Sequence, residues 1–199
     1  MKGYRRLQES RSVFVITGTP GTGKTTISRR VSKRMNANYL SVTRLVRMHQ
    51  LQTSFDYERR TRIVDLRKTR ATIRQVLRRR VGVVVFDTHM PDAIPKDEVS
   101  RVLVLRCDPR ILASRLRTKG WNASKVRENV LAEMLDSCAT VAISYYGARK
   151  IIQLDTSKTT VAACVTSATN ALLKRSAKTT SIDWIKTLER ANALTEFLV

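Results

Sequence analysis

The clearest chemical pattern in the sequence is the octapeptide GTPGTGKT at residues 18–25. It matches the spacing G-x-x-x-x-G-K-[ST], in which glycines allow backbone N–H groups to turn inward around phosphate oxygens. Lys24 would set its ammonium group on the β- and γ-phosphates, and Thr25 would offer its hydroxyl to Mg²⁺. Three of the seven glycines of the chain fall within residues 18–23. The octapeptide therefore predicts a site for a nucleoside triphosphate and Mg²⁺.

Asp87 and His89, at the end of a second apolar run and just after it, could complete this site. Asp87 ends the run VVVFD, residues 83–87, and phosphoryl-transfer proteins of this kind place an acid there to hold Mg²⁺. An aspartate in this place could instead cap a helix or a turn. His89 would point the same way as Asp87 if the strand continued, and could then orient a water or a phosphate oxygen. A purely structural histidine is the alternative.

A basic helix is expected after the next strand, in the segment DPRILASRLRTKGW at residues 108–121. Arg115 and Lys119 are four residues apart and therefore share one face of that helix. A phosphoryl group in transfer needs cations around its equatorial oxygens, and these two side chains could supply them. A solvated basic face with no such role is the alternative, because arginine is abundant throughout the chain.

Strands and helices are predicted to alternate along the chain. Short apolar, β-branched runs indicate buried strands at residues 13–17, 39–42, 83–87, 101–106 and 150–155. Apolar periodicity and caps indicate helices at residues 25–35, 43–51, 62–80, from 109 onward, 122–143 as one long helix, and 161–173. Residues 52–60 are mostly polar and are expected to form a loop.

Such an alternation is typical of an α/β fold with a parallel sheet. Ligands of these sheets bind beyond the carboxyl ends of the strands. Four polar or charged residues lie at predicted strand ends, namely Thr17, Asp87, Arg106 and Asp155. We therefore expect the binding site at this edge of the sheet.

The net charge of the chain is unusually positive. It is +22 over 199 residues, which is more than solubility requires. Such a field attracts polyanions, of which nucleic acid is the commonest inside cells. A general arginine bias of the source proteome would be the alternative. The charge therefore favours contact with RNA or a ribonucleoprotein.

Nothing in the sequence indicates a membrane or secreted protein. It contains no apolar run of about 18 residues, and the first residues, MKGYRRLQESRS, lack the apolar core of a signal peptide. The three cysteines, Cys107, Cys138 and Cys164, show no metal-ligand spacing and are expected to be small buried side chains. We expect an intracellular, cytoplasmic protein, present also in the nucleus if the source is eukaryotic.

Four segments together resemble one family. They are GTPGTGKTT, YLSVTRLVRMHQL, VVVFDTH and VLRCDPRILASRLRTKGWNASKVREN. The chain is similar over about residues 13–173 to the adenylate-kinase-related NTPases of small ribosomal subunit maturation. That family includes the coilin-interacting nuclear ATPase and archaeal adenylate-kinase-like proteins. The resemblance implies a three-layer P-loop fold of the nucleoside monophosphate (NMP) kinase type, with a short lid.

The resemblance also implies roles for individual residues. Those that would bind ATP are Gly21, Gly23, Lys24, Thr25, Thr26, Lys119 and Lys158, the last near the donor base. Arg47 stands where an arginine is expected near the acceptor phosphate, within an NMP-binding region at residues 41–64. Residues 118–128 correspond to the lid. Asp87 and His89 would act in ATP hydrolysis.

Two positions depart from the family pattern. Arg44 stands where relatives often have an aspartate, and Lys119 stands where an arginine is usual. Lysine keeps the charge but loses the two-pronged hydrogen bonding of a guanidinium, so phosphoryl transfer could be slower. The domain is expected to span residues 13–178, after a flexible basic extension at residues 1–12 and before a C-terminal extension at residues 179–199.

The resemblance implies an ATP-dependent adenylate kinase with ATPase activity. Its expected partners are rRNA of the precursor small subunit and a platform ribosomal protein, and its cofactors are ATP and Mg²⁺. Three alternatives remain open at this stage: a purely metabolic NMP kinase, a kinase of another small metabolite, and a non-catalytic RNA-binding switch that only binds the triphosphate.

Overall fold

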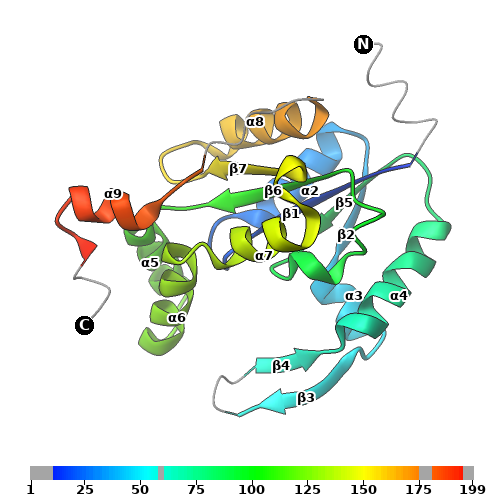
Figure 1. The fold of residues 1–199 in the computed structure, drawn as a ribbon, viewed down its shortest axis with the longest axis horizontal. Helices are drawn as coiled ribbons and strands as arrows, with labels where there is room; N and C mark the ends of the chain where they lie inside the picture. Colours follow the sequence, from blue (N-terminus) through cyan, green and yellow to red (C-terminus); the bar gives the residue numbers. More distant parts are fainter. Residues whose placement is uncertain (1–10, 58–60, 175–180, 195–199) are drawn as a thin grey trace.

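The computed structural model describes residues 11–57, 61–174 and 181–194. Its centre is a five-stranded sheet in the order β2-β5-β1-β6-β7, with every neighbouring pair parallel. The strands are β1 (Ser12–Gly18), β2 (Asn38–Ser41), β5 (Val83–Asp87), β6 (Arg101–Arg106) and β7 (Ile151–Asp155). Figure 1 shows the sheet crossing the middle of the molecule. The α/β class and all five predicted strands are confirmed.

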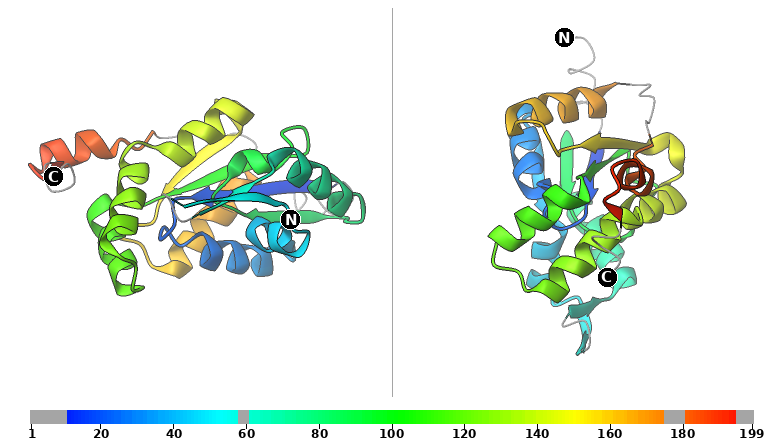
Figure 2. Two further views of the ribbon diagram at one scale, coloured as in Figure 1. Left: turned by 90° about the horizontal axis from the view of Figure 1, so that it is seen from below. Right: turned by 90° about the vertical axis from the view of Figure 1, so that its left-hand side faces the viewer.

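Helices cover both faces of the sheet. Side chains of β1 alternate, so that Val13 and Val15 pack with α3 (Val42–Met48), α4 (Leu66–Arg78) and α7 (Ser137–Tyr146). On the other face, Phe14 and Ile16 pack with α2 (Lys24–Arg34) and α8 (Val161–Leu173). Figure 2 shows α7 and α2 on opposite sides of the strands. The arrangement has the three layers that were predicted.

A third apolar cluster lies beyond β6. It joins α5 (Pro109–Thr118), α6 (Ala123–Met134) and α9 (Trp184–Arg190), which gather on the left of Figure 1. Leu112 and Leu116 of α5 and Leu188 of α9 are fully buried there. The predicted C-terminal extension thus contributes a short helix that packs on the body of the protein.

The region before α4 differs from the prediction of a loop followed by a helix from residue 62. It forms an antiparallel hairpin of β3 (Gln52–Asp56) and β4 (Thr61–Val64), which projects from the body in Figure 1. The helix begins only at Leu66, because the Asp65 side chain accepts a hydrogen bond from the backbone N–H of Lys68 at 2.9 Å. Asp65 is therefore the N-cap, and the β-branched residues before it extend as a strand.

The single long helix predicted at residues 122–143 is also wrong. The chain breaks between α6 and α7, where Asp136 adopts a left-handed conformation with φ of 54°. At the break, the carbonyl of Glu133 and the carboxylate of Asp136 both accept hydrogen bonds from the guanidinium of Arg106. The break therefore leaves the backbone carbonyl of Glu133, which an unbroken helix would use for its own hydrogen bond, available to the buried Arg106.

The ends of the chain are described only in part. Residues 1–10 of the predicted extension lie outside the described residues, but Ser12 already belongs to β1 and Arg11 donates to the carbonyl of Leu77 at 2.9 Å. The folded domain therefore includes Arg11 and Ser12, before the predicted start at residue 13. Two short 3₁₀ turns, η1 (Pro91–Ala93) and η2 (Ala148–Lys150), complete the fold. None of the helices in the described ranges is long and apolar enough to cross a membrane.

Candidate active site

The glycine-rich loop between β1 and α2 has a backbone that only glycine adopts readily. Gly21 and Gly23 have φ of 97° and 96°. At Gly18, where φ is 146°, a Cβ would lie 2.4 Å from the carbonyl oxygen of Leu105 on the neighbouring strand. The loop therefore packs directly against the end of β6. The next turn of the chain is the N-terminus of α2, whose free backbone N–H groups can bind an anion.

Lys24, Thr25 and Asp87 come together as the sequence predicted. β5 pairs with β1 in the register that sets Asp87 opposite Ile16, so the acid lies beside the start of α2. The Thr25 hydroxyl donates to Asp87 Oδ2 at 2.8 Å. Burial lowers the pKa of Lys24 because it penalises the ammonium form, while the Asp87 carboxylate acts in the opposite direction. The site thus combines a desolvated cation with a hydroxyl–carboxylate pair.

The donor atoms of Thr25 and Asp87 suit Mg²⁺. Both are hard oxygens at the same strand end, and Mg²⁺ in nucleotide sites takes only one or two protein ligands beside phosphates and waters. Within the described residues, no group of three or more histidine, cysteine or acidic side chains could hold a metal by itself. The pair therefore fits a magnesium ion that arrives with a nucleotide.

Tyr39 belongs to this cluster and was missed in the sequence. Its hydroxyl donates to Asp87 Oδ2 at 2.9 Å from the neighbouring strand β2, and Arg29 lies over its ring at 5.5 Å from the centroid. The pKa of Tyr39 is raised because the phenol is desolvated and bonded to a carboxylate. The only signal available was its position as the first residue of the strand predicted at residues 39–42.

His89 lies close enough to Lys24 and Asp87 to interact with both charges. Its pKa is lowered, first because the surrounding protein desolvates the ring and then because the Lys24 ammonium repels a second positive charge; Asp87 opposes the shift. The residue nevertheless remains open to solvent. A neutral imidazole near pH 7 is the form that can accept a proton from water. β5 ends at Asp87, so the strand does not continue to His89 as supposed from the sequence, and the role of His89 stays a prediction.

Arg115 has partners that the sequence did not indicate. Its guanidinium donates to the carbonyls of Thr156 at 2.8 Å and Ser157 at 3.4 Å, in the loop after β7. It also lines an open pocket of about 230 Å³ beside the glycine-rich loop. The other lining residues are Gly21, Thr22, Gly23, Thr26, Ile27, Thr156, Val161 and Cys164. Arg115 thus forms one wall of a pocket whose other side includes the apolar side chains of Ile27 and Val161.

The two predicted lysines both follow Arg115 in the chain. Lys119 caps the C-terminal end of α5 and is exposed, and its charge helps to lower the pKa of Lys24. Lys158 is exposed in the same loop as Ser157. Whether either lysine binds a nucleotide stays a prediction.

Comparisons with known proteins agree with this geometry. Residues 15–136 match a family model described as an AAA domain. A Methanocaldococcus jannaschii protein named "Putative adenylate kinase" is 30% identical over 171 residues, or 86% of this chain and 92% of that protein. A Caenorhabditis elegans protein named "Adenylate kinase isoenzyme 6 homolog" is 30% identical over 73% of this chain and 80% of its own. The chain belongs to the adenylate-kinase-related P-loop NTPases.

Solved structures confirm the fold of this P-loop NTPase. Shikimate kinase from Acinetobacter baumannii, in complex with shikimate, matches with a TM-score of 0.57 at 12% identity, over 85% of this chain and 97% of its own. Shikimate kinase from Bacteroides thetaiotaomicron gives 0.54 at 15%, over 81% and 98%. Both similarities concern the three-layer fold.

A second pocket of the P-loop NTPase lies in the predicted NMP-binding region. It has a volume of about 430 Å³ and is lined by Arg47, Gln50, Gln52 and Arg62. Arg62 on β4 donates to Gln52 Oε1 at 2.8 Å, which fixes its guanidinium at the pocket. Sequence reasoning missed Arg62 because it placed this residue at the start of a helix. Two arginines thus face one polar pocket where the sequence had indicated one.

Of the remaining strand-end residues, Arg106 is 1% exposed, and its guanidinium is held by side-chain and carbonyl acceptors inside the fold. Arg44 is exposed on α3, and its backbone N–H donates to the capping hydroxyl of Ser41. Cys107 and Cys164 are buried as predicted, whereas Cys138 is only partly buried and interacts with Lys24.

Proposed function

We propose that this P-loop NTPase is an ATP-dependent NMP kinase of the adenylate type, which also hydrolyses ATP. The observation that carries the proposal is the Lys24–Thr25–Asp87 cluster at one end of β5, combined with a separate pocket lined by Arg47 and Arg62. α3, which carries Arg47, starts right after Ser41, the residue paired with Asp87. A triphosphate site and an anion-binding acceptor site would thus adjoin one strand end.

Each residue would have a distinct task. Lys24 and the N–H groups at the start of α2 would bind the β- and γ-phosphates, and Thr25 with Asp87 would hold Mg²⁺, whose charge would polarise these phosphates. Arg47 and Arg62 would bind the phosphate of the acceptor NMP. Arg115 and the loop that carries Lys158 would hold the donor base, and Lys119 would supply a cation to the phosphates. Positioning and charge provide most of the catalysis in such a transfer.

Hydrolysis would use the same site when the acceptor pocket is empty. His89 would then orient a water towards the γ-phosphate and accept its proton, since the ring is held neutral and lies near Lys24 and Asp87. The balance is ATP plus water giving ADP and inorganic phosphate. With an NMP bound, the γ-phosphoryl group would pass instead to the acceptor phosphate, giving ADP and a second nucleoside diphosphate.

Coupled spectrophotometry of ADP formation tests the enzymatic proposal. The assay contains ATP alone, or ATP with each of the four NMPs, and uses wild type and Lys24→Ala. We expect a slow rate with ATP alone, a faster rate with AMP, and neither with the variant. A rate that no NMP increases would remove the kinase assignment, and hydrolysis that Lys24→Ala leaves intact would place the active site elsewhere.

We further propose a role beside rRNA in maturation of the small ribosomal subunit, in the cytoplasm. The support is the net charge of +22, which suits a phosphate-rich partner. A basic platform ribosomal protein would have to contact the few acidic residues. Sedimentation with small-subunit precursors at increasing salt tests this role. Binding that persists at moderate salt supports it, whereas the absence of cosedimentation would favour a purely metabolic kinase.

A further inference from the structure

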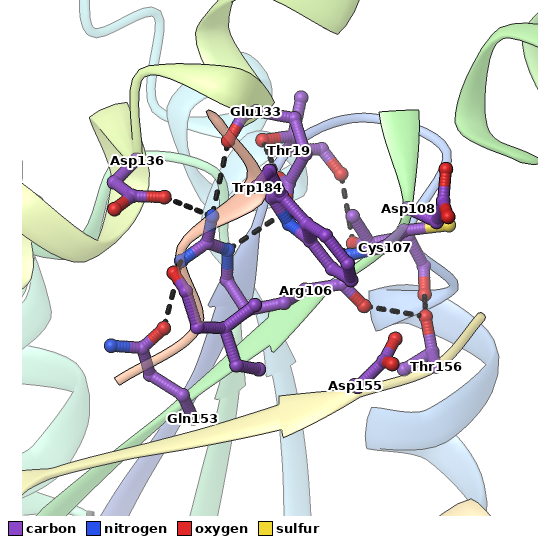
Figure 3. A network of polar contacts seen from close by, with 12 residues as sticks. Thr19, Arg106, Cys107, Asp108, Glu133, Asp136, Gln153, Asp155, Thr156 and Trp184 are labelled. Atoms are coloured by element: carbon purple, nitrogen blue, oxygen red, sulfur yellow. Dashed lines mark hydrogen bonds and ion pairs between the residues drawn. The ribbon is translucent and has the colours of Figure 1, made fainter. Parts of the chain in front are cut away.

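A buried carboxylate lies between the phosphate-binding loop and the C-terminal segment. Glu133 at the end of α6 is 2% exposed, and its Oε2 accepts a hydrogen bond from the Thr19 hydroxyl at 2.5 Å. Its Oε1 accepts from Trp184 Nε1 at 3.0 Å, from Arg106 Nε at 2.7 Å and from the backbone N–H of Cys107 at 3.0 Å. Figure 3 shows Trp184 and Thr19 converging on this one side chain.

Arg106 balances the charge of Glu133 and is itself fully satisfied. Its Nη1 donates to Gln153 Oε1 at 2.7 Å and to the carbonyl of Ile182 at 3.3 Å. Its Nη2 donates to the Glu133 carbonyl and to the Asp136 carboxylate, so all five guanidinium N–H groups have acceptors. Five hydrogen bonds hold the guanidinium in one position, and its bond to Glu133 Oε1 in turn fixes the Glu133 carboxylate.

The contact with Thr19 reaches the backbone of the phosphate-binding loop. Thr19 is 1% exposed, and its carbonyl accepts from the Thr22 hydroxyl at 2.8 Å and from the Thr22 N–H at 3.2 Å. The carbonyl of Thr22 in turn accepts from the Thr156 hydroxyl at 3.0 Å. A displacement of Thr19 would therefore move the turn that precedes Gly23 and Lys24.

The C-terminal segment enters this network at two points. The carbonyl of Ile182 meets Arg106, and the indole N–H of Trp184 meets Glu133. Apolar packing holds the segment there, since Trp184 is 5% exposed and Leu188 of the same helix is fully buried. The segment thus adds both packing and hydrogen bonds to the support of the loop.

We propose that Glu133 is a positioning residue for the phosphate-binding loop, and that the C-terminal segment at residues 181–194 fixes Glu133 through Trp184. The segment is then a working part of the nucleotide site, although it lies about 160 residues after the loop in the sequence. The inference rests on the proposal that the loop binds ATP. Because a preformed loop loses less freedom on binding, weakening this support should raise the Kd for ATP.

The test is a double-mutant cycle in which calorimetry measures the Kd for MgATP of the full chain. Thr19→Val keeps the side-chain shape but removes the hydroxyl, and Trp184→Phe removes the indole N–H. We expect Kd to rise about tenfold for Thr19→Val, equivalent to about 1.4 kcal/mol, and about threefold for Trp184→Phe. The double variant should bind MgATP no more weakly than Thr19→Val alone. Trp184 acts on the loop through Glu133 and Thr19, so its effect is lost once the Thr19 hydroxyl is removed.

Two further variants separate positioning from a general loss of structure. Thr19→Ser keeps a hydroxyl and should restore the wild-type Kd. Thr169→Val makes the same change at a buried threonine of α8, whose hydroxyl donates only within its own helix, and should leave Kd unchanged.

Three results would overturn the inference. They are an unchanged Kd in Trp184→Phe, a double variant whose Kd rises by the product of the two single changes, and a Thr169→Val variant that loses as much affinity as Thr19→Val. The proposed function would fail differently, namely through wild-type protein that forms no ADP from ATP and AMP. The binding cycle would still be measurable in that case.

Discussion

The two ends of the proposed site, a donor end at the loop of residues 18–25 and an acceptor end at the pocket of Arg47 and Arg62, are built in opposite ways. At the donor end, Thr19, Arg106 and Glu133 are each at most 2% exposed and bonded to one another through one buried network. At the acceptor end, the hairpin of β3 and β4 and the neighbouring α3 expose apolar side chains. These include Tyr57 at 84%, Met48 at 63% and Ile63 at 49%.

The difference suggests how binding energy is used at each end. A triphosphate would meet a loop whose conformation the protein has already fixed, so little freedom is lost on binding. A monophosphate would instead bind beside a projecting hairpin whose apolar side chains are exposed, so that the substrate would have to bury them on binding. We therefore expect mutations within the buried network of Thr19, Arg106 and Glu133 to affect both folding and ATP binding, and mutations of the acceptor pocket to affect the binding of one substrate alone.

The largest effect should follow from removing Glu133. Glu133→Ala leaves the buried Arg106 charge without its main partner, and we expect the free energy of unfolding to fall by about 3–5 kcal/mol. Urea denaturation measures this change. The matched control is Arg74→Ala, which breaks the exposed ion pair with Asp97 and should lower the free energy of unfolding far less. Equal losses would show that the donor-end network is no more stabilising than a surface pair.

Lys24→Ala should abolish most of the activity while the protein stays folded. The lost phosphate contact should lower kcat about 10²–10³-fold, or about 2.7–4 kcal/mol, if it resembles other removed donors to a developing charge. Steady-state rates of ADP formation and the thermal midpoint are the measurements. Lys33→Ala, in the last turn of the same helix, is the control and should retain wild-type rates. A variant at residue 24 with more than a tenth of wild-type kcat would contradict the assignment.

Arg47→Ala and Arg62→Ala should affect only the acceptor. Each removes one of the two cations of the acceptor pocket, and we expect KM for AMP to rise about tenfold, equivalent to about 1.4 kcal/mol. KM for ATP and the free energy of unfolding should stay as in wild type. If KM for ATP rises as much as KM for AMP, the two ends are not separate sites.

The smallest effect concerns pH and the cap of α4. The backbone N–H of Lys68 stabilises the Asp65 carboxylate and lowers its pKa from the ordinary 3.8. This contribution to stability is therefore present above that value and is lost as the pH falls through the lowered native pKa. Asp65→Asn can still cap the helix but cannot titrate, so its unfolding free energy should fall less between pH 6 and pH 3. Parallel curves for both proteins would show that the cap does not depend on the charge.

Local patterns predicted the Lys24–Thr25–Asp87 cluster because each of its two parts carries a recognisable pattern of its own. The loop at residues 18–25 and the end of the run at residues 83–87 carry their spacing within one strand and one turn, and the parallel register then aligns Asp87 with Ile16. Glu133, Trp184 and Tyr39 could not be found this way. None of the three belongs to a pattern of its own, and each acts through a partner more than 45 residues away in the chain.

The two errors in secondary structure have the same origin. The periodicity of residues 122–143 is helical throughout, but the needs of the buried Arg106 break the helix at Asp136. The hairpin before α4 depends on pairing between two short strands, whereas the prediction had weighed each segment alone. In both places a tertiary contact overrides a local preference.

Transfer of phosphate to labelled AMP tests the central proposal most directly. Wild-type protein is incubated with unlabelled ATP, Mg²⁺ and AMP labelled in its adenine, and the products are separated by chromatography. We predict that label moves from AMP into ADP, that the transfer needs ATP, and that Lys24→Ala abolishes it. If ATP is consumed while all label stays in AMP, the protein is an ATPase and the kinase assignment is wrong.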